Sequence, residues 1–135
     1  MKYVNQLTDK QVNQLHALYQ NEWWSKGRTL KDTKKCVENS QFIFGLLDEN
    51  ENLIGFSRIL TDQVYKALIF DVIVSDSYRG KGLGQSLIAE IKNHKILRDV
   101  QHFELYCLPE MIPFYEKHGF NSDLGEVKLM RYANL

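Results

Sequence analysis

The chain has 135 residues, of which 44% are hydrophobic and 25% are charged, and its 17 basic and 17 acidic side chains give a net charge of zero. This length and composition are typical of one globular domain with its own core, spanning residues 1–135. The balanced charge argues against a nucleic-acid partner or an anionic membrane surface, and no apolar run is long enough to cross a bilayer.

Two helices are predicted in the first third of the chain. Thr8 and Gln11 have the spacing of a capping box, and apolar side chains follow at helical spacing to about residue 22. Thr29 can cap a second helix. Residues 1–6 contain no apolar core of a signal peptide, so we expect a cytoplasmic protein.

Strands dominate the middle of the chain. Apolar runs over residues 42–47, 53–60 and 65–74 are separated by polar turns, which predicts three consecutive antiparallel strands. A helix from about Gly82 leads to a further strand over residues 102–107. Because that strand follows a helix, it should lie parallel to the one before the helix. The pattern indicates a mixed α/β sheet rather than a doubly wound parallel one.

The last third predicts one more helix and one more strand. Pro109 suits the first turn of a helix, Pro113 should limit that helix, and Gly119 is placed to end it. Alternating side chains over residues 127–132 predict a final strand. The two cysteines lie too far apart to form a metal-ligand spacing, so we expect free thiols and no metal.

A glycine-rich connection joins the central strand to the third helix. The segment Arg79-Gly80-Lys81-Gly82-Leu83-Gly84 would place free backbone N–H groups and positive charge at a helix start. Such an arrangement suits a phosphate or pyrophosphate. The alternative is a tight turn with solvated basic side chains. The spacing matches neither a P-loop nor a dinucleotide fingerprint.

This segment resembles the (Gln/Arg)-x-x-Gly-x-(Gly/Ala) loop of the GCN5-related N-acetyltransferases, the GNAT family. A second segment, Phe114-Tyr115-Glu116-Lys117-His118-Gly119-Phe120, resembles the motif near the end of the same fold. The two are correctly ordered and spaced, and the resemblance covers nearly the whole chain. It implies the GNAT-type acyl-CoA N-acyltransferase fold, a mostly antiparallel sheet with a splayed parallel strand pair and about four helices.

The resemblance implies acetyl-CoA as the acetyl donor. It assigns main-chain groups of two segments to that molecule: Val72, Ile73 and Val74 to the pantetheine arm, and Arg79, Gly80, Lys81, Gly82, Leu83 and Gly84 to the pyrophosphate. It makes Tyr115 the general acid that protonates the departing thiolate. The alternative for Tyr115 is a buried ring with its hydroxyl bonded to main chain. One departure is Leu108, where many relatives carry an Asn that helps to hold the pantetheine.

The sequence indicates less clearly which residues bind and deprotonate the acceptor amine. An amine is mostly protonated at neutral pH, so a base must take its proton, and Asp71 and Glu104 are the candidate carboxylates. Either could equally be an ion-paired or solvated strand residue. Trp24 and Arg28, in the loop between the first two helices, either line the acceptor pocket, as that loop does in the family, or pin the loop to the sheet.

The expected function is therefore N-acetylation of a small-molecule amine, or of a peptide, by direct attack. The alternative is a non-catalytic acyl-CoA-binding sensor or subunit. A generic nucleotide-phosphate binder is a third reading, but the loop lacks the metal-binding Ser or Thr of a P-loop. The resemblance also implies a homodimer, through a surface that the sequence does not identify.

Overall fold

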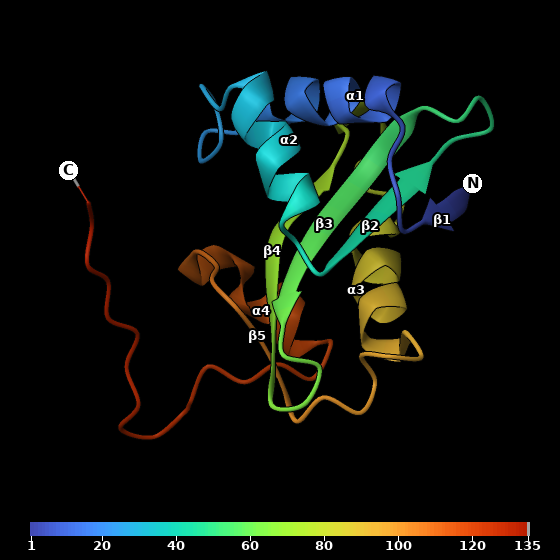
Figure 1. Cartoon of the computed structure of the whole chain (residues 1–135). Helices are drawn as coiled ribbons and strands as arrows, with labels where there is room; N and C mark the ends of the chain where they lie inside the picture. Colours follow the sequence, from blue (N-terminus) through green and yellow to red (C-terminus); the bar gives the residue numbers. More distant parts are fainter. Residues whose placement is uncertain (135) are drawn as a thin grey trace.

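The structure is a computed structural model that describes residues 1–134. In this range a five-stranded sheet with the order β1-β2-β3-β4-β5 forms the centre of the molecule (Figure 1). The strands are β1 (Lys2–Val4), β2 (Phe42–Leu47), β3 (Leu53–Thr61), β4 (Lys66–Val74) and β5 (His102–Leu105). The first four pair antiparallel, and β4 and β5 pair parallel. The predicted mixed α/β sheet is confirmed.

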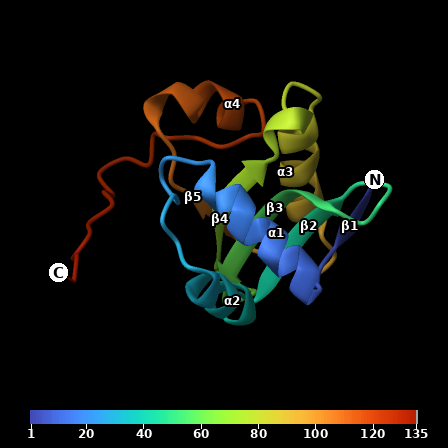
Figure 2. The same cartoon turned by 90° about the horizontal axis from the view of Figure 1, so that it is seen from above.

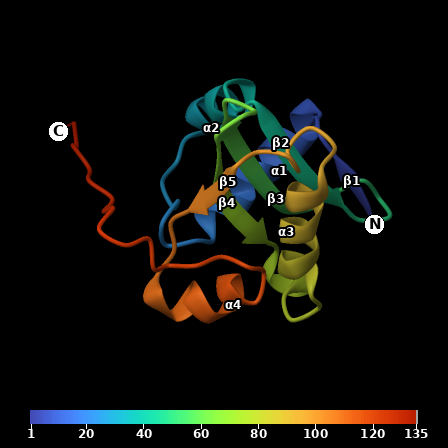
Figure 3. The same cartoon turned by 90° about the horizontal axis from the view of Figure 1, so that it is seen from below.

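Helices cover both faces of the sheet. The helices α1 (Asp9–Gln20) and α2 (Leu30–Glu38) lie on one face, and α3 (Leu83–Asn93) lies on the other (Figure 2). The short helix α4 (Ile112–Glu116) lies beside the N-terminal end of α3 (Figure 3). The expected arrangement of a mixed sheet between helices is therefore confirmed, and the N-terminal end of α3 lies next to α4.

Two apolar clusters hold these layers together. Leu15 and Tyr19 of α1 pack on one face of the sheet with Ile43, whereas Leu87 of α3 packs on the other face with Phe44. Successive residues of a strand point to opposite faces, so a strand buried on both sides reads as an unbroken apolar run. Removing each such side chain from water contributes about 1.5–3 kcal/mol.

The helix starts follow the local signals. Thr8 and Gln11 form the complete capping box, with Gln11 N donating to Thr8 Oγ1 over 3.2 Å and Thr8 N donating to Gln11 Oε1 over 3.0 Å. Thr29 caps α2 by accepting from Asp32 N at 3.1 Å. Pro109 begins a 3₁₀ turn over Pro109–Met111, and α4 starts only at Ile112.

The structure differs from the sequence expectations at three strands. The strand predicted over residues 127–132 is wrong, because no strand of the chain's own sheet lies beside these residues and they take no regular structure. The short strand β1 was not predicted, because three residues are too few to show an alternation of apolar and polar side chains. The predicted strand at residues 102–107 ends at Leu105.

No helix within residues 1–134 has the length and apolarity to span a membrane.

Candidate functional site

The centre of β4 carries a β-bulge at Asp71. The β3 partners advance by two residues (56 to 58) while β4 advances by three (70 to 73). Asp71 has a φ of 56°, a left-handed conformation that Asp tolerates better than most other residues. The extra residue re-aims the side chains beyond it. Accordingly, Ile69 packs on the α3 face of the sheet and Ile73 on the α1 face.

Beyond the bulge, β4 and β5 separate. Their last pair is Ile69 with Leu105, yet β4 continues to Val74. A cleft of about 520 Å³ opens there between the end of β4, the start of α3 and α4, with Val72 and Val74 in its wall. Over residues 70–74, no strand within the described chain pairs with the β5-facing side of β4. The strand splay is thus present, and it leaves main-chain groups that an extended ligand can use.

The glycine loop forms the floor of this cleft. Gly80 and Gly82 have φ values of 78° and 77°, and Gly82 is the N-cap of α3. The N–H groups of residues 80–85 find no acceptor within residues 1–134, and the first helical bond runs from Ser86 N to Gly82 O. A Cβ atom at Gly80 would meet no atom within 4 Å. The loop therefore offers open space and free donors at a helix start, which together suit an anion.

Gly84 has a different part in the loop. It lies within α3, and a Cβ atom there would lie 3.5 Å from Cζ of Phe114. A Cβ atom at that distance makes an ordinary van der Waals contact, so a small residue such as Gly or Ala lets α4 lie against α3 and form the far wall of the cleft. Close packing of this kind needs a small residue but no unusual dihedral.

The two basic side chains of the loop differ in their surroundings. The Arg79 guanidinium pairs with Glu22 and with Asp76, and its Nε donates to Val74 O over 3.2 Å. Its backbone N–H is also engaged, donating to Asp76 O over 3.3 Å. Lys81 has no carboxylate partner within residues 1–134, and its Nζ lies 5.2 Å from the Tyr78 ring centroid. Arg79 thus fastens the loop, and Lys81 is the cation free to meet an anion.

Tyr115 lies on α4 and lines the cleft opposite the loop. The residue is only 9% exposed, and its ring packs edge-on against Phe114 and Phe120, with centroids 5.0 and 5.8 Å apart. Burial, and to a lesser degree the Cys107 thiol, raises the pKa of Tyr115 to about 12. No hydrogen bond from the Tyr115 hydroxyl to another group within residues 1–134 is found, so the main-chain bond expected of an ordinary buried tyrosine is not made there.

Asp71 is the centre of a buried ionic cluster. Its carboxylate, 6% exposed, accepts from Tyr19 Oη at 2.8 Å, from Arg28 Nη1 at 2.9 Å and from Arg58 Nε at 2.7 Å. Burial acts to raise the pKa of Asp71, but the hydrogen bonds and charges of Arg28 and Arg58 outweigh it and hold the pKa below its usual value. Two guanidiniums facing one carboxylate leave one positive charge. Asp71 is therefore suited to anchoring the cluster, and poorly suited to accepting a proton.

The loop between α1 and α2 is attached to this cluster. The Arg28 guanidinium lies 4.6 Å from the Tyr19 ring centroid and 5.4 Å from that of Trp24. Trp24 meets Tyr19 edge-on at 6.3 Å and is 37% exposed, whereas Trp23 is 72% exposed. Trp24 and Arg28 therefore pin the loop and also present exposed surface beside β4.

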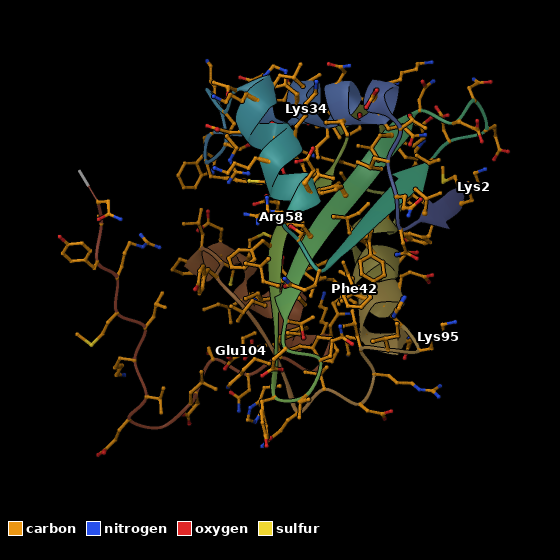
Figure 4. The ribbon with its side chains drawn as sticks, viewed as in Figure 1. Lys2, Lys34, Phe42, Arg58, Lys95 and Glu104 are labelled. Atoms are coloured by element: carbon orange, nitrogen blue, oxygen red, sulfur yellow. The ribbon has the colours of Figure 1, made fainter. Side chains whose placement is uncertain are left out.

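Glu104 lies in a second cavity, which we call the β5 groove. The groove measures about 620 Å³, runs along the outer side of β5, and is lined by Glu104, Cys107, Tyr115 and Phe120 among others. Glu104 pairs with Lys66 over 3.1 Å. Glu104 lies on β5 and Arg58 on β3, nearer α2 (Figure 4). The structure therefore brings Glu104 and Tyr115 to one groove, while Asp71 lines neither cavity.

Some residues of the site escaped the sequence patterns. Arg58 is an isolated charge in an apolar strand, and this isolation is the only indication in the sequence that it belongs to the site. Tyr19 has the spacing of an ordinary core residue of a helix. Gln85, Met111 and Phe114 also line the cleft. Across residues 1–134, no cluster of three or more His, Cys, Asp or Glu side chains is placed to hold a metal ion.

Known proteins resemble this chain in sequence and in fold. The family model described as the Acetyltransferase (GNAT) family matches residues 9–120. The chain is 32% identical over 128 residues to the uncharacterized N-acetyltransferase ycf52 of Pyropia yezoensis, covering 91% of this chain and 73% of that protein. It is 30% identical over 132 residues to histone acetyltransferase TAP1 of Glycine max, covering 90% and 57%. A solved GNAT-family structure from Xanthomonas campestris pv. campestris superposes with a TM-score of 0.84 at 22% identity, covering 98% and 92%.

Proposed function

Because the chain belongs to the acetyltransferase (GNAT) family, we propose that it transfers the acetyl group of acetyl-CoA to the amine of a small molecule or peptide. One observation carries the proposal. A single cleft is bordered by free N–H groups at the start of α3, by an unpaired stretch of β4 and by Tyr115. An acyl-CoA needs an anion site, an extended slot and a proton donor, and these three features supply them.

We expect the cleft to receive the donor molecule. Open space lies in front of Gly80 and Gly82, where added Cβ atoms would meet nothing closer than 4.0 Å. The N–H groups of residues 80–84, with the Lys81 ammonium, would hold the pyrophosphate. The backbone N–H of Arg79 already donates to Asp76 O, so we remove it from the N–H groups expected to bind the pyrophosphate. Main-chain groups of residues 72–74 would pair with the pantetheine arm, and the buried Ile73 side chain would take no part.

Tyr115 would hold the proton that the leaving sulfur needs. Bound acetyl-CoA would supply an acetyl thioester, whose carbonyl carbon the neutral amine attacks directly as the carbon–sulfur bond breaks. With a pKa of about 12, the Tyr115 hydroxyl stays protonated at every pH at which the acceptor amine is being deprotonated. The amine gives up one proton to a base as Tyr115 gives one to the sulfur, and water then carries the proton from the base back to Tyr115, so the protons balance.

Of the two predicted carboxylates, Glu104 is the better placed base. Asp71 is fully engaged by three donors, whereas Glu104 has one cationic partner and a side chain that is 37% exposed. Glu104 also lines the groove that Tyr115 borders. We assign it the removal of the amine proton, directly or through water.

The acceptor side favours a molecule with an acidic or aromatic group. The cluster around Asp71 has one positive charge in excess, and Trp24 presents part of its ring to solvent. A small-molecule amine with such a group suits this surface. The name of the Glycine max relative, a histone acetyltransferase, supports a peptide as the second acceptor class.

Release of free thiol from acetyl-CoA, measured over a panel of amines and basic peptides, tests the function. We expect Tyr115→Phe to lower the rate by about 10²-fold or more and to leave acetyl-CoA binding by calorimetry within about twofold of wild type, because only the transition-state contact is removed. The matched control is Tyr65→Phe, an exposed tyrosine far from the cleft.

Three results would contradict parts of the proposal. Equal rates for wild type and Tyr115→Phe would remove Tyr115 from the reaction. Binding of acetyl-CoA without thiol release for any acceptor would favour the non-catalytic acyl-CoA sensor. No heat with acetyl-CoA or CoA would overturn the function as a whole.

A further inference from the structure

The outer face of α2 carries a row of exposed lysines. Thr33 is buried and Val37 packs against the α1 side of the sheet, so these two side chains define the inner face of the helix. Lys31, Lys34 and Lys35 are exposed and lie three and four positions apart, which places them in one stripe along the helix. We call these three residues the lysine stripe, and Figure 4 labels Lys34 within it.

The charge of the lysine stripe is not neutralised by the rest of the described chain. Residues 26–35 carry five basic side chains and one acidic one, in a chain whose net charge is zero. Within residues 1–134, no ion pair engages the stripe or the exposed Lys26, whereas the nearby arginines, Arg28 and Arg58, both have a carboxylate partner. Unpaired cations gathered on one surface create a positive potential, which attracts an anionic partner.

The lysine stripe begins beside the acceptor side of the candidate site. Arg28 directly precedes Thr29, the N-cap of α2, and its guanidinium is bonded to Asp71 at the β4 bulge. The cluster around Asp71 has one positive charge in excess, so positive charge extends from the bulge onto α2. Trp23, in the connection before α2, is 72% exposed, and tryptophan is enriched at surfaces that bind another protein.

We propose that the acceptor is a peptide or protein segment whose acidic side chains lie along the lysine stripe while a neighbouring amine enters the cleft. Lys31 and Lys35 are four residues apart, about 6 Å along the helix axis, and side chains on one face of an extended peptide are about 6.6 Å apart. Acidic side chains at alternate positions can therefore each meet one lysine. That the docked segment is the acceptor rests on the proposed function, whereas the docking itself does not.

A peptide suits this surface better than a nucleic acid does. The helix α2 has nine residues, about 13.5 Å in length, and Asp32 and Glu38 place two carboxylates among its lysines. A nucleic acid carries negative charge along its whole backbone and is bound by longer basic surfaces, with which the zero net charge of this chain does not agree. A basic peptide would be repelled by the stripe. The surface therefore selects an acidic segment.

Fluorescence anisotropy tests the docking without acetyl-CoA. Three short labelled peptides each carry one lysine and differ only in a run of side chains, which are glutamates, glutamines or arginines. An exposed ion pair changes affinity by about 1.5- to 5-fold, so the glutamate peptide should bind roughly tenfold more tightly than the glutamine peptide, and the arginine peptide should bind most weakly. The preference should vanish at about 1 M salt, where charges are screened beyond about 3 Å.

Two results of this first test would overturn the proposal. One is equal binding of the three peptides at low salt. The other is tighter binding of a single-stranded oligonucleotide than of the glutamate peptide, which would make a nucleic acid the partner.

Charge reversal locates the docked segment. A Lys31→Glu, Lys34→Glu chain should reverse the order and bind the arginine peptide more tightly than the glutamate peptide, with unchanged far-ultraviolet circular dichroism. The matched control is Lys95→Glu, Arg98→Glu, which makes the same change at two exposed residues beyond α3, on the other face of the sheet (Figure 4). The control should keep the wild-type order. A reversed stripe that still prefers the glutamate peptide would overturn the proposal.

Thiol release from acetyl-CoA separates the docking from the proposed function. For the glutamate peptide, reversal of the stripe should raise KM by about tenfold and leave kcat within about twofold, because the stripe binds the acceptor away from the reacting atoms. An unchanged KM would overturn the role of the stripe in acceptor choice. No thiol release with any of the three peptides, together with an intact preference for the glutamate peptide, would contradict the proposed function and leave the docking standing.

Discussion

Replacing Asp71 by Asn isolates the charge at the β4 bulge. Asn has the same size and tolerates the left-handed conformation about as well as Asp, so the backbone is not strained further. The change leaves Arg28 and Arg58, whose side chains are 31% and 16% exposed, without their shared anion. Removing one partner of a buried pair costs about 3–5 kcal/mol. Because both guanidiniums keep some contact with water and the Asn oxygen still accepts a hydrogen bond, we expect about 3 kcal/mol.

Urea unfolding at several pH values measures this loss. The pKa of Asp71 in the folded chain is lower than usual, whereas in the unfolded chain it is about 3.9. The carboxylate therefore stabilises the fold fully above about pH 4, and this contribution is lost as the pH falls through the folded value. The difference between wild type and Asp71→Asn should stay constant from about pH 7 to 5 and shrink below about pH 4.

Asp76→Asn is the matched control. Asp76 pairs with Arg79 at the surface, where its side chain is 68% exposed, and an exposed pair of this kind is worth well under 1 kcal/mol. A loss below about 1 kcal/mol for Asp71→Asn at neutral pH, or a difference that grows as the pH falls, would refute the account of the cluster.

The remaining predictions concern the cleft. Gly82→Ala should lower the free energy of unfolding by about 1–2 kcal/mol, because the φ of 77° is costly for any residue with a Cβ atom. Gly84→Ala should be neutral or stabilising by up to about 1 kcal/mol, since its Cβ would meet Phe114 at an ordinary 3.5 Å; urea unfolding checks both. The rate of thiol release should rise with pH towards the pKa of the acceptor amine. The rate should not fall again below about pH 10, because the pKa of Tyr115 is raised to about 12. A fall in the rate near pH 8 would mean that another group is the acid.

The sequence indicated those features whose cause is local. Thr8 and Thr29 start their helices through bonds to residues three positions on, and the glycine loop needs only positive φ and a helix start. The Asp71 cluster joins Tyr19 and Asp71 across 52 positions, which no local pattern reports. The strand predicted over residues 127–132 is not formed, for a related reason. An alternating pattern of side chains suits a strand, but a strand also needs a neighbouring strand to pair with.

The connection between α1 and α2 is fastened at both of its ends. Glu22 ties one end to Arg79 of the glycine loop, and Arg28 ties the other to Asp71. A graft that exchanged residues 23–27 to redirect acceptor choice would keep both fastenings. A graft that also took Glu22 or Arg28 would release the glycine loop or the bulge, so donor affinity would change together with acceptor preference.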